Sequence, residues 1–167
     1  MDIRHGRYED LPAIVEIYNA SIPGRMATAD TEPATVQDRE EWFRGFDPAR
    51  RPLWVLERDQ RIAGWLGLRS FYGRPAYHRT VESAVYVAPW AQRGGVANAL
   101  LAHALSAAPA LGIANVLAFV FAHNAPSIRL FEAHGFAPWG LLPRVCELDE
   151  DERDVAILGR RLALPVD

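Results

Sequence analysis

Residues 82–101, with the sequence ESAVYVAPWAQRGGVANALL, decide the fold. The first part, residues 83–87, is apolar and rich in β-branched side chains, which predicts a strand that stops at Ala88 and Pro89. Gly94 and Gly95 then open a tight turn, and the apolar spacing over residues 96–105 predicts a helix. A strand followed by a tight turn and a helix is typical of an α/β domain.

The backbone of this turn can bind an anion. Several N–H groups point at one spot where the helix begins, and the helix dipole adds partial positive charge there. Glycines let a phosphate approach the backbone where a Cβ atom would block it. With a carboxylate, Glu82, on the same strand, the unit predicts an enzyme that uses a phosphate-bearing cofactor. The predicted phosphate cradle consists of Arg93, Gly94, Gly95, Val96, Ala97 and Asn98.

Residues 92–97, QRGGVA, fit the pattern Q/R-x-x-G-x-G/A. This segment resembles the acetyl-CoA pyrophosphate loop of the GNAT superfamily of N-acetyltransferases. Three further segments resemble its phosphinothricin and methionine-sulfone acetyltransferase branch: TVESAVYV at 80–87, GRPAY at 73–77 and NAPSIRLFEAHGF at 124–136. The resemblance extends from about Ile3 to about Leu162 and keeps the order and spacing of the segments.

The resemblance implies one GNAT domain over residues 1–167, an α/β fold with a mixed central β-sheet flanked by helices. The hydrophobic pattern agrees with such a fold, since helical and strand-like spacings alternate along the chain. We expect helices at 10–20, 35–46, 96–107 and from Asn124 to Gly135, with Asp10, Thr35 and Asn124 as N-caps. We expect strands at 3–7, 53–57, 62–69, 83–87, 116–121, 139–145 and 155–162.

Composition narrows the function further. A net charge of −3 gives no support for nucleic-acid binding. The single cysteine, Cys146, excludes an internal disulfide and fits a reducing cytoplasm. The polar N-terminus does not read as a signal peptide, and no apolar run is long enough to cross a membrane. The five histidines form no metal-ligand pattern, so we expect no metal.

Acetyl transfer requires that the amine lose a proton and that the thioester oxygen be stabilised as it becomes anionic. The resemblance implies that Glu82 is the general base, acting directly or through a water. Alternation places Glu82 on one strand face with Ala84 and Tyr86, and we expect its carboxylate to be buried because the strand is mostly apolar. The alternative is a structural carboxylate, either solvated at an edge strand or paired with a buried cation.

The resemblance also implies the remaining cofactor contacts. Backbone N–H groups of Val85, Tyr86 and Val87 match those that hold the thioester in this superfamily. Asn124 and Ser127 match the segment that contacts the cofactor. Core packing is the alternative for the three strand residues, and an ordinary helix cap is the alternative for Asn124, although each can hold together with cofactor binding.

Phe131 departs from the family pattern. Many GNAT members have a tyrosine general acid at this position, and relatives in the branch often have histidine. Phenylalanine cannot donate a proton, so either the thiolate leaves unassisted or another group or a water protonates it. Coenzyme A thiolate is a good leaving group, so such an acid is dispensable in principle.

Two segments bear on the acceptor. By resemblance, Arg74, Tyr77 and Arg79 flank the entrance to the site, where an arginine fork suits a carboxylate or phosphinate. The alternative is that they are exposed loop residues. The acidic run ELDEDE at 147–152 departs from the branch and is either a solvated hairpin or a feature that selects a cationic amine.

The sequence therefore predicts an N-acetyltransferase that moves an acetyl group from acetyl-CoA to the primary amine of a small amino-acid-like substrate of the phosphinothricin or methionine-sulfone type. Two alternatives stay open. The chain could acetylate a protein N-terminus or a polyamine, or it could be a non-catalytic acetyl-CoA-binding module. A homodimer is expected, because symmetric dimers are the commonest oligomers and the branch forms them.

Overall fold

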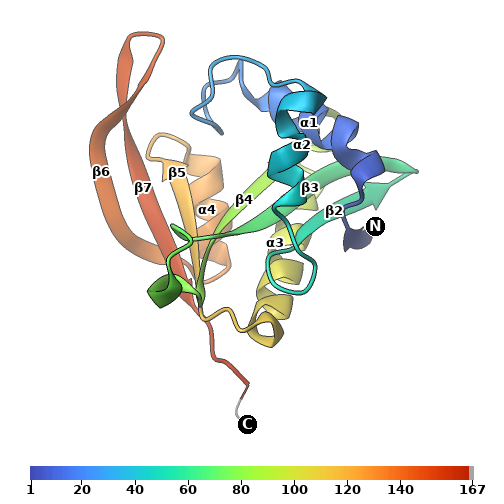
Figure 1. The fold of residues 1–167 in the computed structure, drawn as a ribbon. Helices are drawn as coiled ribbons and strands as arrows, with labels where there is room; N and C mark the ends of the chain where they lie inside the picture. The colour runs from blue at the N-terminus through green and yellow to red at the C-terminus, as the bar shows by residue number, and fades with distance from the viewer. Residues whose placement is uncertain (166–167) are drawn as a thin grey trace.

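Seven strands form one mixed sheet in the computed structural model, which describes residues 1–165. Its spatial order is β1-β2-β3-β4-β5-β7-β6, and only the β4–β5 pair is parallel (Figure 1). The predicted mixed α/β fold is confirmed. The strands are β1 (Asp2–His5), β2 (Leu53–Arg58), β3 (Arg61–Ser70), β4 (Thr80–Val87), β5 (Asn115–Phe121), β6 (Ala137–Leu148) and β7 (Asp151–Arg161).

Helices cover both faces of the sheet (Figure 1). A Cβ atom on Gly67 would lie 2.8 Å from the ring of Phe46, just after α2, whereas a Cβ on Gly64 would lie 2.7 Å from Val96 of α3. Positions 64 and 67 point to opposite faces, so α1 and α2 lie on one face and α3 on the other. The helices are α1 (Leu11–Ser21), α2 (Val36–Arg44), α3 (Val96–Ala107) and α4 (Ala125–Ala133).

Helix starts follow the predicted capping residues at two positions. The hydroxyl of Thr35 accepts the N–H of Asp38 at 3.1 Å, and Asn124 Oδ1 accepts the N–H of Ser127 at 3.2 Å. The prediction that Asp10 caps α1 was wrong. A 3₁₀ turn at Tyr8–Asp10 precedes the helix, so the Asp10 carboxylate instead accepts the N–H of Arg7 and pairs with Arg4, each at 2.7 Å.

Strands β4 and β5 separate along their length. Their parallel ladder contains three pairs, from Thr80 with Asn115 to Glu82 with Leu117. Beyond that point β4 stays paired with β3, while β5 stays paired with β7 as far as Phe121. The sheet is therefore open between the second half of β4 and the second half of β5 (Figure 1).

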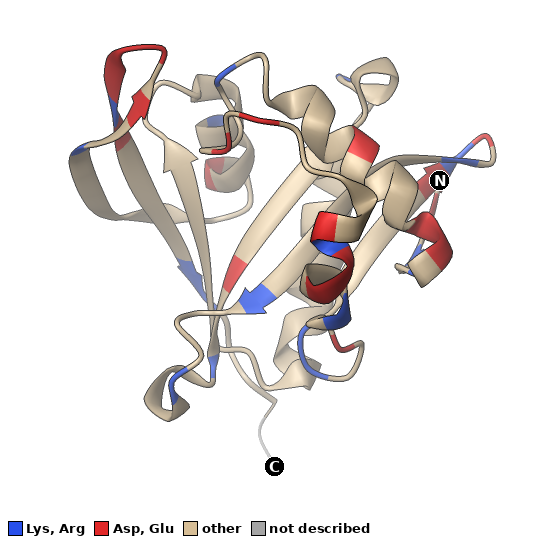
Figure 2. Ribbon diagram, turned by 45° about the horizontal axis from the view of Figure 1, so that its top comes forward, with Lys and Arg blue, Asp and Glu red and all other residues tan. Residues whose placement is uncertain are grey.

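The hairpin of β6 and β7 is longer than predicted. Its strands extend to Leu148 and from Asp151, and Asp149 and Glu150 form a two-residue turn with positive φ of 51° and 68°. Most of β6 is exposed, so its pairing leaves little hydrophobic pattern in the sequence. The acidic run at 147–152 is thus the tip of a solvated hairpin, and Figure 2 shows acidic residues gathered there.

Candidate active site

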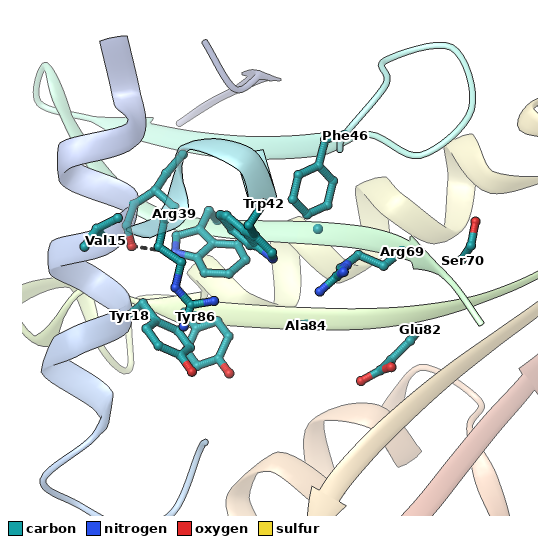
Figure 3. A pocket seen from close by; sticks show the side chains of 13 residues that line it. Val15, Tyr18, Arg39, Trp42, Phe46, Arg69, Ser70, Glu82, Ala84 and Tyr86 are labelled. Atoms are coloured by element: carbon teal, nitrogen blue, oxygen red, sulfur yellow. Dashed lines mark hydrogen bonds between the residues drawn. The ribbon is translucent and has the colours of Figure 1, made fainter. Parts of the chain in front are cut away.

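A cavity of about 330 Å³ lies between the β3–β4 pair and helices α1 and α2 (Figure 3). Glu82, Ala84 and Tyr86 all contribute to it, which confirms that these residues share one face of β4. Its wall is largely aromatic, and three charged side chains reach into it. The lining residues are Ile14, Val15, Tyr18, Arg39, Trp42, Phe46, Trp65, Gly67, Arg69, Ser70, Glu82, Ala84 and Tyr86.

A second, smaller cavity of about 110 Å³ lies in the opening between β4 and β5. It shares Glu82, Ala84 and Tyr86 with the first cavity, so the two spaces meet along β4. The second cavity also takes in the start and middle of α4 and part of the loop after α1. Its remaining lining residues are Met26, Ala27, Ser83, Val85, Ala118, Phe119, Val120, Asn124, Ser127 and Phe131.

The backbone of β4 offers donors to this opening. The N–H of Ala88 donates to Ala63 of β3 at 2.8 Å, which fixes the direction of alternation along the strand. The N–H of Tyr86 therefore also points toward β3 and is not available to the opening, so the prediction that it holds the thioester together with its neighbours was wrong. The N–H groups of Val85 and Val87 point toward β5. Because the β4–β5 ladder ends at Glu82, these two donors face the opening between the strands, and Val85 also lines the second cavity.

The Glu82 side chain is exposed to the cavity, so the prediction of a buried carboxylate was wrong. The physical reason is the separation of the strands, which opens space beside the last ladder pair. The cavity walls still desolvate the group in part, and this raises the pKa of the Glu82 carboxyl above its ordinary value, while the positive charge of Arg69 opposes the rise. Among residues 1–165, no cation forms an ion pair with Glu82.

The predicted cradle lies where α3 begins. Gly95 is the residue before the helix and has φ of 76°, a conformation that favours glycine. The N–H of Ala99 donates to the carbonyl of Gly95 at 2.9 Å, so the N–H groups of Val96, Ala97 and Asn98 lie before the first helical hydrogen bond. Such donors are suited to an anion.

Arg58 of β2 contacts the backbone of the predicted cradle, and the sequence did not predict this contact. Its Nη2 donates to the carbonyl of Gly94 at 2.8 Å, and a Cβ on Gly94 would lie 2.6 Å from its Nη1. On the other side, Nε2 of His134 lies 2.7 Å from Oδ1 of Asn98. Arg93 is exposed and has φ of 60°.

Asn124 and Ser127 lie together at the second cavity. The Asn124 amide also donates to the carbonyl of Met26 at 2.8 Å, which ties the loop after α1 to the start of α4. Phe131 is buried, and its ring lies 5.0 Å from that of Phe136. The second cavity therefore has the apolar ring of Phe131 in its wall, beside Asn124 and Ser127. This is the position where many GNAT members have a tyrosine that can donate a proton.

Arg74, Tyr77 and Arg79 lie on the exposed loop before β4, and none of them lines either cavity. Tyr77 packs on Phe71 with ring centroids 5.4 Å apart. The backbone carbonyl of Arg79 accepts the N–H of Ala114 at 2.9 Å. The structure does not bring these three side chains to Glu82 within the single chain.

Two other arginines, Arg39 and Arg69, line the first cavity. Arg39 stacks over the Tyr18 ring at 4.6 Å and pairs with Asp30 at 2.9 Å. The hydroxyl of Tyr18 also bonds to Asp30 and to Thr28, so the loop after α1 is anchored at this end of the cavity. Neither arginine could have been placed at the site from the sequence, because Arg69 meets Glu82 through the β3–β4 register and Arg39 comes from a distant helix.

A sequence model described as the Acetyltransferase (GNAT) family matches residues 11–136. The chain belongs to the GNAT acetyltransferase family. The match runs from the start of α1 past the end of α4, so it includes the cradle, Glu82 and Asn124. The predicted membership of the GNAT superfamily is thereby confirmed.

Named relatives agree with the predicted branch of GNAT enzymes. A Bacillus subtilis protein named provisionally as a phosphinothricin acetyltransferase is 48% identical over 98% of this chain and 100% of its own length. An L-methionine sulfoximine/L-methionine sulfone acetyltransferase of Salmonella typhimurium is 28% identical over 87% of this chain and 85% of its own. A phosphinothricin acetyltransferase of Sinorhizobium meliloti, solved in complex with acetyl-CoA, superimposes with a TM-score of 0.90 at 28% identity, covering 96% of this chain and 88% of that one.

Proposed function

We propose that this GNAT enzyme transfers the acetyl group of acetyl-CoA to the primary amine of a small amino-acid-like acceptor. One observation carries the proposal: the two cavities meet along β4 at Glu82. An acceptor in the aromatic cavity and a thioester in the opening between β4 and β5 would then approach each other from opposite sides of the same strand. Holding two reactants in this way removes much of the entropic cost of their encounter.

The residues at this junction supply the chemistry that the reaction needs. Glu82 accepts a proton from the bound ammonium, directly or through a water, and its raised pKa brings it closer to that of the amine than an ordinary carboxyl would be. The N–H groups of Val85 and Val87 stabilise the thioester oxygen as negative charge develops on it. Tyr86 contributes its ring to the acceptor cavity, while its N–H is directed toward β3.

The cofactor is held, in this proposal, from the cradle to α4. The residues Arg93, Gly94, Gly95, Val96, Ala97 and Asn98 bind the pyrophosphate through the backbone donors at the start of α3. Asn124 and Ser127 contact the arm that leads to the thioester. The cradle has room for a pyrophosphate, because no atom lies within 4 Å of the position that a Cβ on Gly95 would take. Phe131 supplies no proton, so the thiolate leaves unassisted or takes a proton from water.

The acceptor class follows from the cavity and from the names of the relatives. A polyamine would favour an anionic site, and the acidic hairpin tip is the candidate for one. That tip is partly neutralised by two arginines, one from the loop after α1 and one from β6. Arg25 pairs with Asp149 at 3.0 Å, and Arg144 pairs with Glu152. These contacts favour the solvated-hairpin interpretation over cation selection. The Bacillus and Salmonella relatives are named for phosphinothricin and for methionine sulfoximine or sulfone, which are amino-acid analogues.

A homodimer through β6 belongs to the same proposal. This strand is at the edge of the sheet and exposes a row of large apolar side chains. An exposed apolar edge strand is a favourable surface for a second copy, and burying it would also cover unpaired backbone groups. The exposed side chains are Trp139, Leu141, Leu142 and Val145.

We further propose a cytoplasmic enzyme, for which the single thiol of Cys146 is the supporting feature. Among the described residues, no helix is long and apolar enough to span a bilayer, and no group of three or more potential ligands forms a metal site.

One assay tests the proposed function. Thiol release from acetyl-CoA is followed with methionine sulfone, phosphinothricin, spermidine and a short peptide as acceptors. We expect turnover with one or both amino-acid analogues. Preference for spermidine or the peptide would contradict the acceptor class, and tight acetyl-CoA binding without turnover of any amine would indicate a non-catalytic module.

A further inference from the structure

Arg69 is placed directly opposite Glu82 in the β3–β4 ladder. Directly opposed residues of an antiparallel pair have their Cβ atoms about 4.5–5.5 Å apart and lie on the same face of the sheet. Both side chains line the aromatic cavity, and Figure 3 shows them projecting into the same end of it. The candidate base therefore has a guanidinium as its nearest charged neighbour across the strands.

The guanidinium of Arg69 has no side-chain partner among the described residues. Within residues 1–165, Arg69 forms no ion pair and no side-chain hydrogen bond, whereas Arg39 in the same cavity is paired with Asp30. Nearby Arg51 is also committed, since its Nη2 donates to the carbonyl of His78 at 2.6 Å. The cavity thus offers one free cation and one free anion side by side.

We propose that Arg69 binds the α-carboxylate of the acceptor and thereby presents the α-amine to Glu82. An α-amino acid carries its ammonium and carboxylate on the same carbon, so a cation and an anion on adjacent strands match its two charges. The planar guanidinium can hold a carboxylate through two parallel hydrogen bonds, which fixes orientation as well as position. This inference rests on the proposed function and names the residue that selects the amino-acid part of the acceptor.

The remaining space accounts for the acceptor side chain. From the Arg69 end, the cavity continues past Trp42 toward Tyr18 and Arg39 (Figure 3). An uncharged or polarisable side chain such as a sulfone would lie against these rings. A polyamine would instead bring a second cation close to Arg69, which the Coulomb repulsion between like charges disfavours.

The experiment compares two amines that differ only in the carboxylate: L-methionine sulfone and 3-(methylsulfonyl)propylamine. Wild type, Arg69→Gln and Arg69→Lys are assayed with both, with Arg50→Gln as a control for an exposed arginine outside the cavity. We expect Arg69→Gln to lower kcat/KM for methionine sulfone about 10–100-fold, mainly through KM, as expected for the loss of hydrogen bonds to a charged group. The decarboxylated amine should be affected little, and Arg69→Lys should give an intermediate loss.

A second readout separates substrate binding from a merely structural role. Since Arg69 opposes the rise in the pKa of Glu82, its removal should move the acidic limb of the kcat/KM profile to higher pH. Thermal melting of each variant establishes that it is folded.

The outcomes are distinct. If wild type acetylates both amines equally well, both the proposed acceptor class and the role of Arg69 are wrong. If wild type prefers methionine sulfone and Arg69→Gln keeps that preference, the role of Arg69 alone is overturned. Loss of the preference in Arg74→Gln with no loss in Arg69→Gln would assign the carboxylate to the loop arginine instead.

Discussion

Glu82 and Leu117 form the last pair of the parallel β4–β5 ladder. The candidate base therefore lies at the point where the sheet opens, and the backbone donors of Val85 and Val87 follow it directly along β4. In the proposed reaction, proton transfer and stabilisation of the thioester oxygen would therefore take place within a few residues of one strand.

Replacing Glu82 with glutamine should lower kcat about 10²–10⁴-fold, the usual loss when a general base is removed. Acetyl-CoA affinity should change little, because Glu82 is not part of the cradle. In wild type, the acidic limb of the pH–rate profile should fall above the pH expected for an ordinary glutamate, since the pKa of Glu82 is raised. Steady-state kinetics across pH test this prediction, and a glutamine variant with wild-type turnover would make Glu82 structural.

The same substitution should change stability in a pH-dependent way. A carboxyl whose pKa is higher in the folded state favours folding when it is protonated, so its contribution is full below the unfolded pKa and is lost as pH rises through the folded value. Glu82→Gln should therefore melt at a higher temperature than wild type at neutral pH, and the difference should shrink below about pH 4, under the ordinary pKa of glutamate. A difference that grows toward acid would contradict the raised pKa.

Gly95→Val should abolish measurable acetyl-CoA binding. The residue has φ of 76°, which a β-branched side chain rarely adopts, and the added side chain would stand where the pyrophosphate approaches. Gly112→Val is a matched control, because Gly112 has φ of 74° and is likewise without neighbours within 4 Å of a built Cβ. Both variants should lose similar stability in thermal melts, but only Gly95→Val should fail to bind in calorimetry. Equal binding by both variants would remove the cradle assignment.

Arg58→Gln should weaken acetyl-CoA binding about 3–10-fold, since it removes a charged hydrogen bond to the Gly94 carbonyl from an exposed position. The KM for the amine should not change. Arg61→Gln serves as the control, because Arg61 stacks on Trp90 at 4.4 Å and does not reach the cradle. An Arg58 variant with unaltered KM for acetyl-CoA would show that the cradle holds its shape alone.

Phe131→Tyr should alter kcat by less than about threefold at neutral pH, because a thiolate that leaves readily gains little from an acid. The ring is buried against Phe136, so the added hydroxyl also has to find a partner in the second cavity. Kinetics with acetyl-CoA test this directly. A rise of tenfold or more would mean that departure of the thiolate limits the wild-type enzyme.

Leu141→Glu should convert the proposed dimer to a monomer. Leu141 is 57% exposed on the edge strand β6, and a charge there opposes burial against a second copy. Sedimentation velocity measures the change. Val36→Glu is the control, at a valine of α2 that is 37% exposed and is not part of β6. A wild-type protein that sediments as a monomer would contradict the dimer.

The sequence predicts most of the fold because its signals are local. Gly94 and Gly95 mark the turn before α3, and Thr35 and Asn124 are recognisable caps of α2 and α4. Local sequence signals do not predict features that depend on contacts between segments far apart in the chain or on pairing between strands. Asp10 pairs with Arg4, which is brought close by β1, and the tip of the β6–β7 hairpin is held by backbone pairing without an apolar pattern.

The sequence predicts the part of the candidate site that lies on β4 and the turn after it, but not the residues that other elements contribute. Glu82 and the cradle belong to one continuous segment, so the local signals for a strand, a turn and a helix are enough to place both. The exposure of Glu82 depends on the separation of β4 from β5, a tertiary feature. Arg39, Arg58 and Arg69 reach the site from α2, β2 and β3, and only sheet register and helix packing reveal which of many arginines these are.

The separate walls of the two cavities have an evolutionary consequence. The proposed acceptor cavity is built from β3, α1 and α2, and the proposed cofactor opening from β5, α4 and the loop after α1. Both cavities share residues of β4. If the two cavities have these roles, substitutions in α1 or α2 change which amine is accepted while the acetyl donor keeps its contacts. Homologous enzymes with this arrangement can then evolve new acceptor specificities while they keep the same binding site for the acetyl donor.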